Sequence, residues 1–122
     1  MPTGIDLLIS AFAKFLDAGF GTDMAKYGLF GFCFEPGALS TTSHVERASA
    51  SAAIWQQKMG ELPNPYEDVL AFFEEGGQLG RWENNILDVF LASGERFGVP
   101  LRTFVQLASN YSLKRTDQSL RD

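Results

Sequence analysis

The chain has 122 residues, of which 45% are hydrophobic and 20% are charged, and its net charge is −5. This length fits one domain, and the composition excludes an intrinsically disordered chain. The excess of acids argues against binding nucleic acid through overall charge, and no apolar run reaches the ~18 residues that a membrane-spanning helix needs.

Cysteine usage indicates a reducing compartment. Cys33 is the only cysteine, so no disulfide can form within the chain. A small secreted domain would usually carry an even set of cysteines. The first residues also lack the basic segment of a signal peptide. We therefore expect a cytoplasmic protein that does not contact a membrane.

The N-terminal third predicts a first helix and then a segment that is harder to assign. Thr3 and Asp6 are spaced as a capping pair, and a wide apolar stripe with helical spacing begins at Ile5. Such width is typical of a central helix or of one shared with another chain, so a homodimer through this Phe-rich helix is expected. In the second segment, 23–34, the apolar run 29–34 could be a helix or a short buried strand. The absence of β-branched residues in that run favours a helix.

Capping patterns predict the third and fourth helices. Ser43 and Glu46 form a capping box before a helix over about 44–62. Asn64 followed by Pro65 predicts the start of a fourth helix. The glycine pair at 76–77 is expected to end it.

The last third predicts two more helices. A fifth is expected after Gly80, with apolar residues from Trp82 onwards, and a sixth from Pro100. The fold class is therefore expected to be all-α, a compact single-domain bundle of five or six helices with short Gly/Pro-punctuated loops. The domain would cover residues 1–113, with a polar C-terminal tail over 114–122.

The sequence contains few residues in patterns that are typical of catalytic sites. His44 and Cys33 are the only residues of their types, too few for a structural zinc site. The apolar neighbours of Cys33 are expected to raise the pKa of its thiol, which disfavours a nucleophile. Glu74 and Glu75 are adjacent on a helix and would point in different directions. We therefore expect a protein that is not an enzyme, with no catalytic residues, cofactor or metal.

An acidic block suggests a protein partner. Residues 61–90 hold seven acids and one base. Aromatic and Arg side chains are frequent anchors of interfaces, although aromatic residues here could equally pack in the core. The leading hypothesis is a small acidic interaction protein, such as a regulator, adaptor or inhibitor. Its predicted partner-binding residues are Tyr66, Glu67, Asp68, Glu74, Glu75, Arg81 and Trp82.

The segment 94–115 offers an alternative. Gly94, Gly98, Val99 and Phe104 resemble the spacing of a helix-turn-helix. A DNA-binding protein built this way would use Arg102, Thr103, Gln106, Asn110, Lys114 and Arg115. Nucleic acid is the less favoured partner, because phosphate contacts must come from a few bases in an acidic chain.

Overall fold

A computed structural model describes the backbone of residues 4–34 and 41–121, and their side chains except those of residues 32, 41–43 and 112–121. The chain order of the elements is α1 (Ile5–Asp17), α2 (Thr22–Phe30), the 3₁₀ helix η1 (Gly31–Phe34), α3 (Thr41–Met59), α4 (Pro65–Glu74), β1 (Gln78–Glu83), β2 (Ile86–Phe90), β3 (Arg96–Pro100) and α5 (Leu101–Arg121).

The expected all-α bundle is wrong, because a three-stranded antiparallel sheet replaces the predicted fifth helix. Leu87 and Val89 are both fully buried and alternate with the half-buried Asp88, which is the two-residue period of a strand. Asn84 and Asn85 lie between β1 and β2 with φ angles of 54° and 61°. Two such residues make the tight turn whose twist matches that of a hairpin, and asparagine tolerates this conformation well.

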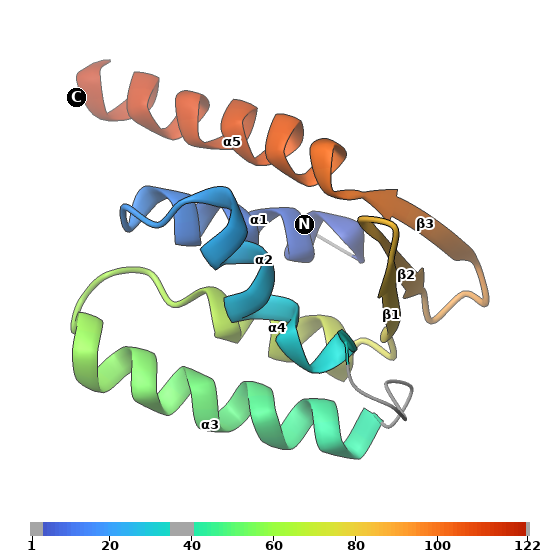
Figure 1. The fold of residues 1–122 in the computed structure, drawn as a ribbon. Coiled ribbons are helices and arrows are strands. Elements are labelled where there is room, and N and C mark those ends of the chain that lie inside the picture. The colour runs from blue at the N-terminus through green and yellow to red at the C-terminus, as the bar shows by residue number, and fades with distance from the viewer. Residues whose placement is uncertain (1–3, 35–40, 122) are drawn as a thin grey trace.

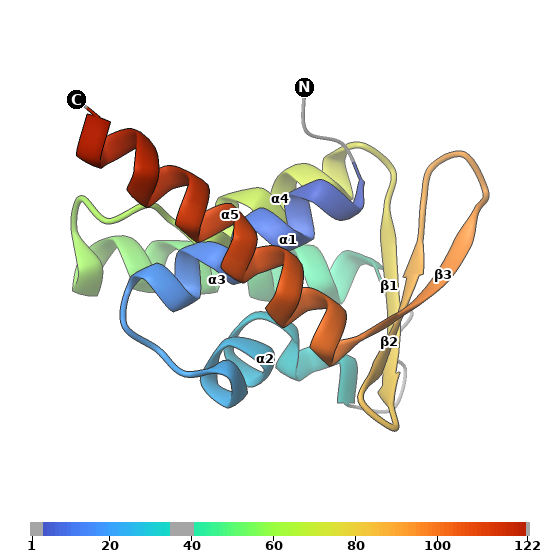
Figure 2. The ribbon, with the colours of Figure 1, turned by 90° about the horizontal axis from the view of Figure 1, so that it is seen from above.

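The sheet has the order β1-β2-β3, with β2 in the centre. In the first hairpin Glu83 pairs with Ile86, and in the second Phe90 pairs with Arg96. The register shifts between Leu79 and Trp82, where β1 is irregular. One face of the sheet packs on the helices and the other is open to solvent. The turns of the two hairpins lie at opposite ends of the sheet (Figure 2).

Helix α1 lies at the centre of the helical layers. It packs between α4 and α5, and α3 covers the other side of α4, while the sheet stands at one end of this stack (Figure 1). Every side chain from Leu7 to Ala13 is buried. The wide apolar stripe of the sequence therefore reflects a central helix, and the chain itself covers the surface through which a homodimer was expected.

The remaining predictions for the helices are largely confirmed. The Asn64 side chain accepts a hydrogen bond from the backbone N–H of Tyr66 at 3.0 Å, as expected for the cap of α4. Residues 29–34 contain no strand, since they complete α2 and form η1. The expected start of the third helix after Ser43 is wrong, because α3 begins at Thr41 and Ser43 lies inside it. The side chain of Ser43 and the whole of Thr3 lie outside the described residues.

Helix α5 is longer than expected and helps to close the core. It continues to Arg121, through the segment predicted to be a polar tail. Phe104 of α5 stacks on Phe12 of α1 with 5.7 Å between ring centroids, and Trp82 of β1 contacts Phe104 at 6.1 Å. The core thus joins α1, α5 and the buried face of the sheet. No helix among the described residues is long and apolar enough to cross a membrane.

Candidate functional site

Two residues of the predicted partner-binding set belong to the core. Tyr66 is buried, and its hydroxyl donates a hydrogen bond to the carbonyl of Gly28 at 2.9 Å. Burial raises the pKa of Tyr66, while a hydrogen bond from Ser51 acts in the opposite direction. Trp82 is also buried, against Phe30. These two aromatic side chains pack in the interior and offer little accessible surface to a partner.

The charged members of the set do not form one surface. The Asp68 carboxylate accepts a hydrogen bond from the Ser10 hydroxyl at 3.0 Å and pairs with Lys14 at 2.9 Å, so it braces α4 against α1. Arg81 is exposed on β1, whereas Glu67 and Glu74 are exposed on α4. The member of the set that borders the cavity described next is Glu75.

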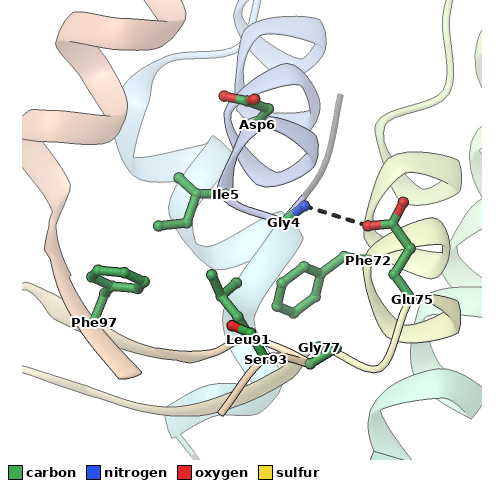
Figure 3. Close-up of a pocket in the computed structure, with 10 residues that line it drawn as sticks. Gly4, Ile5, Asp6, Phe72, Glu75, Gly77, Leu91, Ser93 and Phe97 are labelled. Carbon is green, nitrogen blue, oxygen red and sulfur yellow. Dashed lines mark hydrogen bonds between the residues drawn. The ribbon is translucent and has the colours of Figure 1, made fainter. Parts of the chain in front are cut away.

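A cavity of about 420 Å³, which we call the acidic hollow, lies where three parts of the chain meet. These parts are the start of α1, the end of α4 and the turn between β2 and β3 (Figure 3). The residues that line it are Gly4, Ile5, Asp6, Phe72, Glu75, Gly77, Leu91, Ala92, Ser93 and Phe97.

The floor of the acidic hollow is apolar and tightly packed. Phe72 is only 1% exposed, and a Cβ atom built on Gly77 would lie 2.4 Å from its ring. Gly77 therefore allows the chain to leave α4 directly over this ring. Ile5, Leu91 and the partly exposed Phe97 lie on one side of Phe72 in Figure 3, so apolar surface is accessible from the cavity.

The rim of the acidic hollow is negative. Asp6 and Glu75 both line the cavity, and none of its lining residues is Lys, Arg or His. Glu75 accepts a hydrogen bond at 3.4 Å from the backbone N–H of Gly4, the glycine that caps the start of α1. The positive end of the helix dipole thus holds this carboxylate at the rim.

A second cavity, of about 630 Å³, lies at the other end of the sheet, and we call it the amide hollow. It is bounded by the turn between β1 and β2 and by the first two turns of α5. Its lining residues are Thr22, Asn84, Asn85, Ile86, Pro100, Leu101, Arg102, Val105 and Gln106.

The helix-turn-helix predicted around this cavity is not formed. Strands β2 and β3 occupy the place where the first helix of the motif should be, so no helix directly precedes α5 to set it across a DNA backbone. All six residues named for DNA binding lie on α5. Arg102, Gln106 and Asn110 are exposed and Thr103 is half-buried, whereas the side chains of residues 114 and 115 lie outside those described.

Cys33 and His44, the only cysteine and histidine of the chain, are both buried. Burial raises the pKa of the Cys33 thiol to about 12, so the reactive thiolate is disfavoured. Burial, and secondarily the charge of Arg47, lowers the pKa of His44. Within the described parts of the chain, no group of three or more His, Cys, Asp or Glu side chains could hold a metal ion.

Sequence reasoning missed most of the acidic hollow. The sequence pattern predicts that Asp6 caps a helix. It places Leu91 in a helix and Phe97 in a turn. Residues 5, 72 and 91 come together only in the folded chain, so no local sequence pattern predicts that they line one cavity. Comparison of the chain with models of protein families, with curated protein sequences and with solved structures gave no match.

Proposed function

We propose that the protein is a small non-catalytic interaction protein, a regulator, adaptor or inhibitor, that binds a basic segment of a protein partner at the acidic hollow. One observation carries this proposal: accessible apolar side chains and two carboxylates, Asp6 and Glu75, line the same cavity, and no basic side chain lines it. Because Cys33 is buried and forms no disulfide, we propose that the protein acts in the cytoplasm.

The chemistry of the cavity suits a lysine or arginine side chain next to an apolar residue. Long basic side chains have an apolar stem and a charged head, so the stem can lie against Leu91 and Phe97 while the head meets the carboxylates. Partial exclusion of water strengthens this attraction relative to that on an open surface. An aromatic or aliphatic neighbour in the partner would cover Ile5 and anchor the contact.

A pair of peptides tests the chemistry directly. The probes are acetyl-Phe-Lys-Leu-amide and acetyl-Phe-Glu-Leu-amide, titrated into isotope-labelled protein and followed by NMR. We expect only the lysine peptide to shift the backbone signals of Gly4, Glu75, Leu91 and Ser93. Equal binding of both peptides would remove the acidic hollow as the contact site.

Co-purification then tests the function with the natural partner. Tagged protein is captured from extract of the source cell with nuclease treatment, beside the double variant Asp6→Asn/Glu75→Gln. The matched control is Glu46→Gln/Glu61→Gln, which neutralises two exposed carboxylates away from the cavity. A stoichiometric protein should be retained by the control and lost by the cavity variant. Retention by both variants contradicts the proposal, and loss of every partner on nuclease treatment favours nucleic-acid binding through α5.

A further inference from the structure

We propose that the amide hollow binds a small carboxylate that has an aliphatic body. This site is separate from the proposed partner site and lies at the opposite end of the sheet. A volume of about 630 Å³ falls in the range of cavities that hold small organic ligands.

A buried ammonium group is hydrogen-bonded to Asn85, one of the residues that line the cavity. Lys26 is 7% exposed and donates a hydrogen bond to Oδ1 of Asn85 at 2.6 Å. The rings of Tyr27, Phe34 and Trp82 lie around it, with centroids 5.1–5.3 Å from its Nζ. Among the described residues no carboxylate pairs with Lys26. Buried charges are usually paired, and among the described residues Lys26 is held by a neutral amide and three rings, so its charge favours an anion near Asn85.

Lys26 also fixes the orientation of the amide that faces the ligand. An ammonium group can only donate hydrogen bonds, so the oxygen of Asn85 must point to Lys26. The NH₂ group of Asn85 is therefore left as a donor. Hydrogen bonds in a chain polarise one another, which makes this NH₂ a stronger donor toward an anion.

The remaining lining residues define the rest of the ligand. Arg102 is exposed, makes no ion pair with the described residues and is the charged side chain of the lining, so it supplies one positive charge for a carboxylate. The apolar walls come from Ile86, Leu101 and Val105, all aliphatic. No aromatic ring lines the cavity, which favours a flexible aliphatic body over a flat ring system that would stack.

Octanoate, octanol and octylammonium at equal concentrations below micelle formation are the probes. Each is titrated into the full chain and followed by the NMR signals of the side-chain amides of Asn84, Asn85 and Gln106. Octanoate should shift all three signals and bind at least tenfold more tightly than the other two. Equal affinity for octanoate and octanol, or shifts confined to the acidic hollow, would overturn the proposal.

Two variants and a control separate the ligand contact from the fold. Asn85→Asp gives Lys26 a counter-charge and adds a negative charge to the cavity, so it should lower octanoate affinity at least tenfold without lowering the melting temperature. Arg102→Gln should lower octanoate affinity at least tenfold and leave octanol unchanged. Arg81→Gln, on β1 and outside the lining, should change neither. Unchanged octanoate binding in Arg102→Gln contradicts the assignment whether or not Asn85→Asp folds.

Discussion

The two ends of the sheet carry cavities of similar construction and opposite charge. At each end a hairpin turn and a helix terminus enclose apolar walls, but Asp6 and Glu75 border one cavity and Arg102 borders the other. The net charge of −5 conceals this division, because it is a sum over the whole surface. The comparison shows that the backbone sets where a cavity forms, while a few side chains on the flanking helices set what it can bind.

The ends also differ in what supports them. The acidic hollow rests on the ring of Phe72, which is part of the core. The amide hollow is bordered by the Asn84–Asn85 turn, to which buried Lys26 is hydrogen-bonded. Substitutions at the two supports should therefore have unequal effects on stability. The predictions that follow use this inequality, in order of decreasing effect.

Removing the floor of the acidic hollow should have the largest effect. Phe72→Ala is expected to lower the free energy of unfolding by about 3–5 kcal/mol, because it opens a hole in a packed interior. Phe97→Ala, at a 38% exposed wall of the same cavity, should lower it by less than about 1.5 kcal/mol. Chemical denaturation measures both. Similar losses for the two variants would mean that Phe72 is not a core support.

At the amide end, stability should depend on how well the residue at position 84 tolerates a positive φ. Asn84 has a φ of 54°, a region that costs alanine roughly 1–2 kcal/mol. Asn84→Ala should lower the free energy of unfolding by about that amount. Asn84→Gly should stay within about 0.5 kcal/mol of the parent, since glycine adopts positive φ freely. Equal stability of the two variants in denaturant unfolding would argue against a strained turn.

The stability of the protein should also depend on pH through His44 of α3, whose ring lies 5.9 Å from that of Phe73. Burial, and then Arg47, lowers the pKa of His44 from 6.5, so the unfolded chain binds a proton at a pH where the folded chain does not. The contribution of neutral His44 to the free energy of unfolding is therefore full above about pH 6.5. It is lost as the pH falls, by at most about 1.4 kcal/mol per pH unit.

The matched variant is His44→Gln, which cannot titrate. Its free energy of unfolding between pH 7 and pH 5 should fall less steeply than that of the parent chain. Both proteins are unfolded with urea at each pH, so that other acidic groups contribute equally to the two curves. Parallel curves would show that His44 has the same pKa in both states.

Local signals predicted the helices well and the sheet poorly. Asn64 before Pro65 correctly predicts where α4 begins, because helix capping involves only residues that are close in sequence. The apolar residues of β2 also fit a helical stripe, so periodicity over five residues could not separate the two structures. The decisive signal was the pair Asn84 and Asn85 between Trp82 and Leu87, a hairpin turn that the helix assignment overlooked.

The candidate sites were less accessible to sequence reasoning than the fold. Glu75, predicted to bind a partner, borders the acidic hollow, whereas Tyr66 and Trp82 are core residues whose aromatic character gives no sign of burial or exposure. Both cavities join segments that are far apart along the chain. Their lining depends on tertiary packing, which a single sequence does not reveal.

The position of α1 between α4 and α5 has a consequence for synthesis of the protein. Phe12 emerges from the ribosome well before Phe104, the residue on which it stacks. While the segment between them is being synthesised, one flank of this apolar helix has no native cover. Nascent chains with such exposed surface are prone to aggregate and are held by chaperones. Release of the nascent chain from chaperones should therefore coincide with the emergence of α5.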